Sequence, residues 1–291
     1  MNAERPVDMG EGASSKARRS RRVGVQTARW GRRYLPFVVG LATAVGALNS
    51  GSAWAVQIVK LKVGFKPNQL STSTTIKTAF QIRTTTGGVP SPLLSVDIGL
   101  PPGMGLAMTD LGLSTCSTEA LEVLGVAGCS PNAVMGFGEG VGDVAFGPVV
   151  VRQAAPITIL MGEPIDEHTS LLFFVNPQTP ILGQYIFPTV LLPSTTPDSA
   201  AQLETTVPLI PTVPEGNSVS VVSVKTSFGP EGLKYRRHVH GRVVSFTPKG
   251  FVIPSRCPKG GFPFRGTFTF QDGSVVSRRA AVPCPRGGKR R

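Results

Sequence analysis

The chain has 291 residues with 26 Pro and 34 Gly, so short elements joined by many turns are expected. Its apolar fraction of 41% is enough for a hydrophobic core. The net charge of +13 by itself would indicate a nucleic-acid-binding protein. The distribution of this charge along the chain argues against that interpretation. Residues 1–33 carry nine Lys or Arg against three acids, residues 34–233 carry seven against 13, and residues 234–291 carry fourteen against one. A basic leader, a mildly acidic body and a basic end do not make a uniformly basic nucleic-acid-binding chain.

The leader has the features of a secretory signal. The apolar run over residues 35–48 is shorter than the roughly 20 residues that a membrane span needs and matches a signal-peptide core. Ala53 and Ala55 place small residues at the −3 and −1 positions of a signal peptidase site. We therefore predict a signal peptide over residues 1–55, Sec export with cleavage after Ala55, and a secreted or cell-surface protein.

Two alternatives for the leader stay open. The Arg32-Arg33 pair is a cue for twin-arginine export, although such pairs are common in the basic part of any signal. An uncleaved membrane anchor over residues 34–56 would require Asn49 and Ser50 to lie inside the bilayer.

Four cysteines in an exported chain predict two disulfides. Three connectivities are open. Pairing of nearest neighbours, Cys116 with Cys129 and Cys257 with Cys284, closes the shortest loops and suits the local patterns. A link from Cys116 to the C-terminal cysteines is the alternative.

The body of the chain consists of short strand patterns separated by Pro-rich and Gly-rich turns, so we predict an all-β fold, a β-sandwich or two β-rich lobes, with one short helix. If two parts exist, they span residues 56–200 and 201–291, with a boundary near 192–204; a single domain is the alternative. The predicted strands cover residues 57–64, 74–86, 92–99, 136–143, 157–161, 170–175, 185–192, 218–227 and 233–246, followed by a terminal hairpin.

Two segments depart from the simple strand pattern. Residues 116–124 form the helical candidate, because Ser117 or Thr118 can cap its first turn and Glu119 suits the positive end of its dipole. Residues 136–143 place glycine at every second position, and Val141 stands where the dinucleotide-binding pattern needs its third glycine. We expect a strand with a bare face against which another backbone or an aromatic ring packs closely.

The terminal hairpin has the clearest signature in the chain. Thr and Phe alternate up to Phe270, and Asp272-Gly273 is the pair typical of a two-residue type I′ turn. Cys257 and Cys284 flank the unit, so we predict a hairpin closed by a disulfide at its base.

Catalytic and metal-binding patterns are weak in this sequence. Nucleophile-elbow, zinc-protease, phosphate-loop and calcium-loop motifs are missing. On one strand His238 and His240 would share a face as half a metal site, with His168 a distant third, but neighbouring arginines would repel a dication. We predict no cofactor and no metal. A carboxylate site for hydrolysis is the alternative, and its candidates are Glu139, Asp143, Glu163, Asp166 and Glu167.

The basic C-terminal segment is the most suggestive functional feature. It could hold the exported protein on an anionic cell-wall polymer or a membrane surface, although arginine-rich strands are often only solvated. Nucleic acid is a poor partner for an exported chain without an aromatic-interleaved face. The candidate binding residues are Arg236, Arg237, Arg265, Arg278 and Arg279.

Several motifs together resemble one group of proteins. They are Leu94 to Gly103, Cys116 with Cys129-Ser130-Pro131, Ser255 to Pro258, Phe268 to Gly273, and Cys284-Pro285. This combination resembles a group of secreted β-rich proteins of high-GC Gram-positive (actinobacterial) bacteria, for which no activity is established. The resemblance implies export, two local disulfides and an all-β body, and it implies no site residues.

From these observations we expect an exported, non-enzymatic β-sandwich protein that acts as a cell-surface or cell-wall-associated binding or structural module. A secreted hydrolase with a carboxylate site is the alternative.

Overall fold

The computed structural model describes residues 55–106, 110–178, 182–194, 196, 198–211 and 216–285, which belong to one compact unit. The predicted leader up to Trp54 and the basic tail from Arg286 onward lie outside the described residues.

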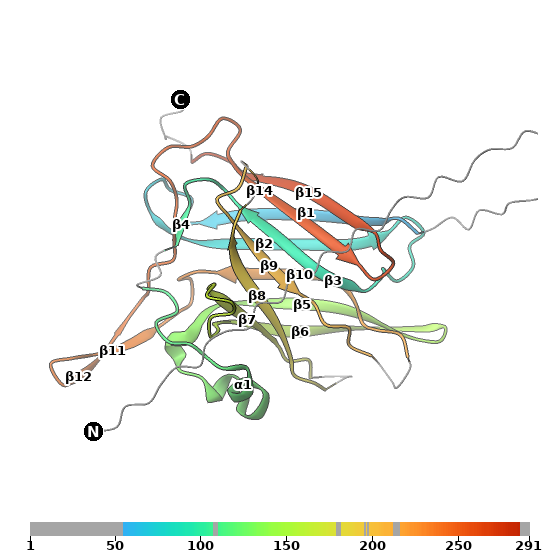
Figure 1. Ribbon diagram of the computed structural model, residues 1–291, viewed down its shortest axis with the longest axis horizontal. Coiled ribbons are helices and arrows are strands. Elements are labelled where there is room, and N and C mark those ends of the chain that lie inside the picture. Colours follow the sequence, from blue (N-terminus) through green and yellow to red (C-terminus); the bar gives the residue numbers. More distant parts are fainter. Residues whose placement is uncertain are drawn as a thin grey trace, which may run out of the picture. The chain divides into compact units, whose positions relative to one another are not determined.

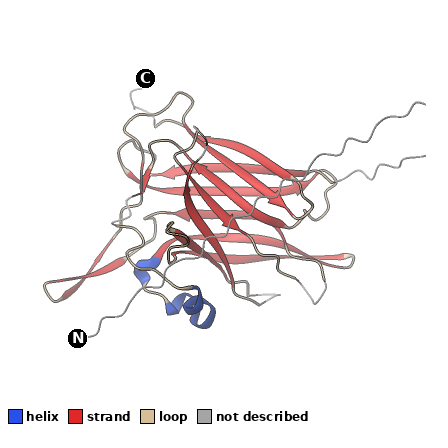
Figure 2. Cartoon of the chain, in the orientation of Figure 1, coloured by secondary structure: helices blue, strands red, loops and turns tan. Residues whose placement is uncertain are grey.

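The regular secondary structure of the described part is almost entirely β-strand, as predicted, with one short α-helix and two single turns of 3-10 helix (Figure 2). The elements are β1 (Gln57–Lys66), β2 (Ser73–Thr84), β3 (Leu93–Leu100), β4 (Gly105–Leu106), α1 (Thr118–Leu124), β5 (Val134–Phe146), β6 (Val149–Met161), β7 (Ser170–Val175), β8 (Tyr185–Pro193), β9 (Ala201–Thr206), β10 (Ser220–Phe228), β11 (Tyr235–Val239), β12 (Arg242–Phe246), β13 (Phe251–Val252), β14 (Phe262–Phe270) and β15 (Val275–Val282), and the 3-10 turns are Gly125–Gly128 and Pro131–Ala133.

Thirteen of the described strands form one antiparallel sheet. Apart from the two-residue strands β4 and β13, they follow one another in the order β1, β2, β10, β5, β6, β7, β8, β9, β3, β14, β15. The two end strands, β1 and β15, lie side by side, so the eleven strands curl into a nearly closed, barrel-like sheet (Figure 1). Strands from both sides of residue 200 neighbour each other in it, since β9 pairs with β3 and β8.

The predicted β-sandwich is therefore wrong. An apolar residue at every second position gives each strand one buried face in a sandwich and in a barrel alike. The difference lies in which strands become neighbours. Here β3 pairs with both β9 and β14, which joins the middle of the chain to its end within one continuous sheet.

Inward-facing side chains make the main core. The phenylalanines of β14 all point inward and are at most 1% exposed: Phe262, Phe264, Phe268 and Phe270. Phe65 of β1 packs against Phe262, with ring centroids 5.5 Å apart, and Phe80 of β2 packs against Phe268 at 5.1 Å. These ring contacts bring the end of the chain against its first strands.

The terminal hairpin is confirmed, and its turn differs from the prediction. β14 and β15 pair from Phe262 opposite Val282, and Cys257 and Cys284 form the disulfide at the base, with Cα atoms 5.8 Å apart. Only Gly273 has positive φ, whereas a type I′ turn needs two such residues. The Asp272 carboxylate instead accepts a hydrogen bond from the Ser274 amide at 2.9 Å, which suits a longer turn that ends in a left-handed glycine.

The predicted helix and the other disulfide are also confirmed. Ser117 caps α1, since its hydroxyl accepts a hydrogen bond from the Ala120 amide at 3.2 Å. Cys116 and Cys129 are bonded and clip the helix into its loop. Leu121 is fully buried in a small cluster against β6 and β7, so the helix covers part of the outer face of the sheet.

The glycine-rich strand is β5, and the prediction of a bare face is confirmed. A Cβ atom at Gly138 would lie 2.5 Å from the Lys225 carbonyl oxygen, and one at Gly136 would collide with the Ser227 carbonyl. Any side chain at these two positions would push β10 away from β5.

Candidate functional site

The predicted basic residues of the terminal hairpin fall on different faces. Arg265 and Arg279 are directly opposite each other on β14 and β15, and both are exposed on the outer face of the sheet. Arg278 lies opposite Gly266, on the side that faces inward. Its Nε donates a hydrogen bond of 2.9 Å to the Val59 carbonyl oxygen of β1. Arg278 therefore ties the two end strands together rather than standing free.

The outer face beside this hairpin is more basic than the sequence division suggested. The alternation of β1 and β2 turns their cations outward, next to those of the hairpin. We call the following set the basic face: Lys60, Lys62, Lys66, Lys77, Arg83, Lys225, Arg265 and Arg279. Six of these eight cations lie within residues 34–233, the segment that carries more acids than bases. The alternating lysines of β1 are visible in the sequence, but the sequence does not show that β1 lies beside the C-terminal hairpin.

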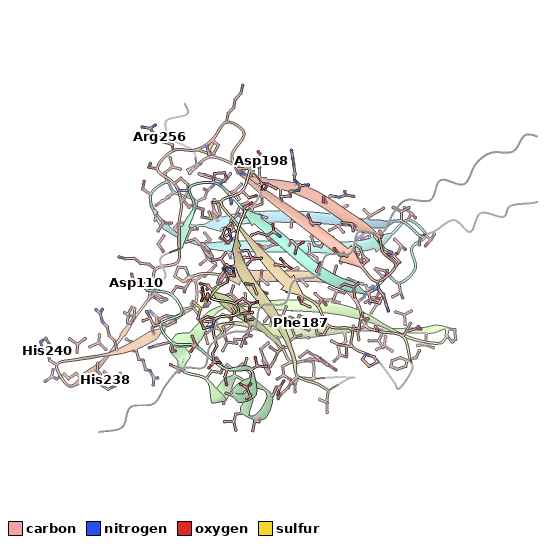
Figure 3. The ribbon with its side chains drawn as sticks, in the orientation of Figure 1. Asp110, Phe187, Asp198, His238, His240 and Arg256 are labelled. Carbon is pink, nitrogen blue, oxygen red and sulfur yellow. A yellow bond between two sulfur atoms is a disulfide. The ribbon has the colours of Figure 1, made fainter. Side chains whose placement is uncertain are left out.

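Few acids neutralise the basic face. Glu231 pairs with Lys66 and with Lys77, the latter at 3.0 Å, and these hydrogen bonds and charges lower the pKa of Glu231. The same contact raises the pKa of Lys66. Asp198 lies 3.6 Å from Arg279, and both side chains are mostly exposed (Figure 3 labels Asp198). The cations that form no ion pair with an acid among the described residues are Lys60, Lys62, Arg83, Lys225 and Arg265. Of these, Lys225 lies directly opposite Glu139 of β5.

An open groove of about 730 Å³ crosses the basic face. Lys62, Lys77 and Lys225 line it from three neighbouring strands. Phe137 of β5 contributes an aromatic ring that is 45% exposed. Glu139 and Glu231 are the acids on its wall. The groove offers positive charge and one apolar platform in a solvent-exposed channel.

Arg236 and Arg237 do not join the basic face. They lie on β11, in a separate two-stranded hairpin that Figure 1 shows well away from β14 and β15. The Arg237 guanidinium stacks 5.0 Å from the centre of the Phe246 ring, and the Arg236 amide donates to the Asn132 side chain at 2.9 Å. The five predicted arginines therefore occupy two separate places.

The same hairpin corrects the prediction of one strand over residues 233–246. His240 and Gly241 both have positive φ and turn the chain between β11 and β12. His238 and His240 lie near the tip of this hairpin (Figure 3). Within the ranges that the structure describes, no three His, Cys, Asp or Glu side chains gather as metal ligands.

The five predicted carboxylates do not converge. Glu139 and Asp143 lie on β5, whereas Glu163, Asp166 and Glu167 lie between β6 and β7. Glu139 is opposite Pro156, and Glu163 follows seven residues further along, roughly 20 Å at the rise of a strand. Paired glycosidase carboxylates lie within about 10 Å of each other. Asp143 is 5% exposed and is held by Arg152, whose Nε lies 2.7 Å from its Oδ1.

The structure brings together one carboxylate pair that the sequence reasoning missed. Asp97 of β3 is directly opposite Glu204 of β9, on the outer face of the sheet. Partial burial raises the pKa of Asp97, and the charge of Glu204 raises it further. The pair could not be seen in the sequence, because 107 residues separate the two positions.

Comparisons with protein families, with curated proteins and with solved structures gave no significant match. The fold and the site therefore define the class of this protein: an all-β protein with a nearly closed antiparallel sheet and a basic outer face. Its two disulfides fit an oxidising, extracytoplasmic location. None of the helices in the described ranges is long and apolar enough to cross a membrane.

Proposed function

We propose that this protein is an extracytoplasmic, non-enzymatic binding module that holds an anionic cell-wall polymer on its basic face. The observation that carries the proposal is the set of eight outward-facing cations on five adjacent strands. Five of the eight cations form no ion pair with an acid in the described part of the chain. Clustered charge of one sign attracts a polyanion and speeds its association.

The groove favours a polymer over a bilayer as the partner. The outer surface of a curled sheet is convex, so a flat membrane would meet only a few of the cations at once. A flexible chain bearing phosphate or carboxylate groups can follow the groove past Lys62, Lys77 and Lys225.

The test is binding of the purified protein to poly(glycerol phosphate) at several salt concentrations. The double variant Lys62→Glu/Lys225→Glu should weaken binding at least tenfold, because each cation near an anionic surface is worth about 1 kcal/mol. The matched control Arg236→Glu/Arg237→Glu makes the same charge change on the separate hairpin and should retain most of the binding. Equal loss in both variants, or tighter binding to anionic phospholipid vesicles than to the polymer, would refute the proposal.

The alternative, a secreted hydrolase, has one observation in its favour, the Asp97 and Glu204 pair. A carboxyl group with a raised pKa suits a general acid. If the protein cleaves the wall polymer and Asp97→Asn abolishes that cleavage, the protein is a hydrolase and not a binding module.

A further inference from the structure

The inside of the barrel-like sheet contains unfilled space. Its buried side chains form two clusters, one that includes Phe264 and Ile157 and one that includes Phe80 and Phe268. A cavity of about 110 Å³ is lined by members of both clusters and so lies between them. A second cavity of about 100 Å³ adjoins the first. The residues that line both are Ile157, Phe187, Val221 and Val224, and Figure 3 labels Phe187.

This space is larger than ordinary packing leaves. Protein interiors are packed as densely as organic crystals, with few voids larger than a water molecule. Phe173, Phe187 and Leu203 face the first cavity and are only partly buried, although they belong to the interior of the sheet. Eight strands already enclose an interior that side chains can just fill, so eleven strands enclose more.

One glycine leaves the second cavity unfilled, although no neighbouring backbone atom prevents a side chain at its position. Gly140 of β5 lines this cavity, and a Cβ atom there would meet the Ile157 Cδ1 at an ordinary contact distance of 3.5 Å. Gly136 and Gly138 are different, because the backbone of β10 leaves them no room. A side chain at position 140 would fit and would occupy the cavity.

The first cavity carries two pairs of threonines on well-separated walls. Thr189 of β8 is opposite Thr205 of β9, and their hydroxyl oxygens lie 2.8 Å apart. Thr78 of β2 is opposite Thr226 of β10, and all four residues line the same cavity. Only one hydroxyl of the first pair donates within the pair, so the other retains a proton for a ligand oxygen.

The lining also indicates which ligands would be rejected. No Lys, Arg, Asp, Glu or His appears among the described residues that line either cavity. An ionised head group buried there would have no partner, and burial of an unpaired charge is very costly. A neutral group that accepts or donates one hydrogen bond would be satisfied by the threonines.

We propose that the interior of the barrel-like sheet binds a neutral, slender apolar molecule, an alkyl chain that carries a hydroxyl or carbonyl group. The chain occupies the two adjoining cavities, and its polar group bonds to the Thr189 and Thr205 pair. This site is independent of the basic face, since it uses the opposite side of the sheet.

The test is calorimetric titration of the purified protein with three probes of equal chain length: 1-octanol, n-octane and octanoate at pH 8. We expect saturable binding of 1-octanol, binding of n-octane several-fold weaker, and no binding of octanoate. Equal binding of all three probes, or the absence of saturable 1-octanol binding, would overturn the proposal.

Two variants locate the site. Gly140→Val should weaken 1-octanol binding at least tenfold by filling the second cavity. The matched control is Gly64→Val on β1, where a Cβ meets nothing within 4 Å, and it should bind as the unmodified protein does. Thr189→Val/Thr205→Val keeps the shape and removes both hydroxyls of the pair, so it should reduce 1-octanol binding to the level of n-octane. If Gly140→Val fails to fold by circular dichroism, Thr189→Val/Thr205→Val decides alone, and an unchanged preference for 1-octanol in that double variant would contradict the assignment.

Discussion

Tyr235 allows a quantitative test of how the β11–β12 hairpin is anchored. Its side chain is 0% exposed, its hydroxyl donates to the Val134 carbonyl oxygen at 2.5 Å, and it accepts from the Gly112 amide at 3.0 Å. The substitution Tyr235→Phe keeps the ring and leaves both backbone groups without this partner. An orphaned buried polar group costs about 1–3 kcal/mol, so we expect a loss of about 2 kcal/mol in the free energy of unfolding. For a domain of this size that is about 4–8 °C in melting temperature.

The assay is urea denaturation followed by far-ultraviolet circular dichroism under non-reducing conditions. Tyr185→Phe is the control, since Tyr185 is partly buried and its hydroxyl has no hydrogen-bond partner in the described part. Burial raises the pKa of Tyr235, against a smaller lowering by the Gly112 amide. The contribution of Tyr235 to the free energy of unfolding is therefore fully present below about pH 10, the ordinary tyrosine pKa. It is lost as the pH rises through the higher pKa that Tyr235 has in the folded state. A loss within 0.5 kcal/mol of that of the control, or the same alkaline pH dependence in Tyr235→Phe as in the unmodified protein, would refute the reasoning.

Three further changes test the sheet itself. Gly136→Ala should cost about 1–3 kcal/mol because its Cβ collides with the β10 backbone; chemical denaturation measures this, and a neutral effect would mean that β10 can move freely. Asp97→Asn should stabilise the protein at pH 7 by a fraction of a kcal/mol, since a raised folded-state pKa means that ionisation opposes folding. Melting curves should show that gain shrinking below about pH 4, where Asp97 is protonated in both states; a pH-independent gain would contradict the electrostatic cause. Replacing both cysteines of the terminal disulfide, which are 27 positions apart, by serine should cost about 3–4 kcal/mol from loop entropy. The same double variant should also bind the anionic polymer more weakly. Unchanged polymer binding would show that the disulfide contributes to stability and not to binding.

The local features of this fold could be predicted from the sequence because short-range chemistry decides them. The capped helix after Cys116, the bare face of the glycine-rich strand and the terminal hairpin each depend on residues a few positions apart. Both disulfides followed from loop length, since the nearest cysteines meet with the least loss of chain entropy.

Long-range pairing decided the rest. Alternation shows which side chains of a strand are buried, and it does not show which strand becomes its neighbour. Our prediction of a β-sandwich was wrong for this reason, because β3 pairs with both β9 and β14 within one continuous sheet.

The candidate sites could not be predicted for the same reason, because unpredicted strand pairs bring their residues together. The basic face joins lysines of β1 and β2 to arginines about 190 to 220 residues later, so a charge count along the chain placed the lysines in an acidic segment and the arginines in a basic one. The threonine pairs inside the sheet form only when β8 meets β9 and β2 meets β10. The sequence thus determined which elements this protein is built from, and only the tertiary structure determined which charges and hydroxyls those elements bring together.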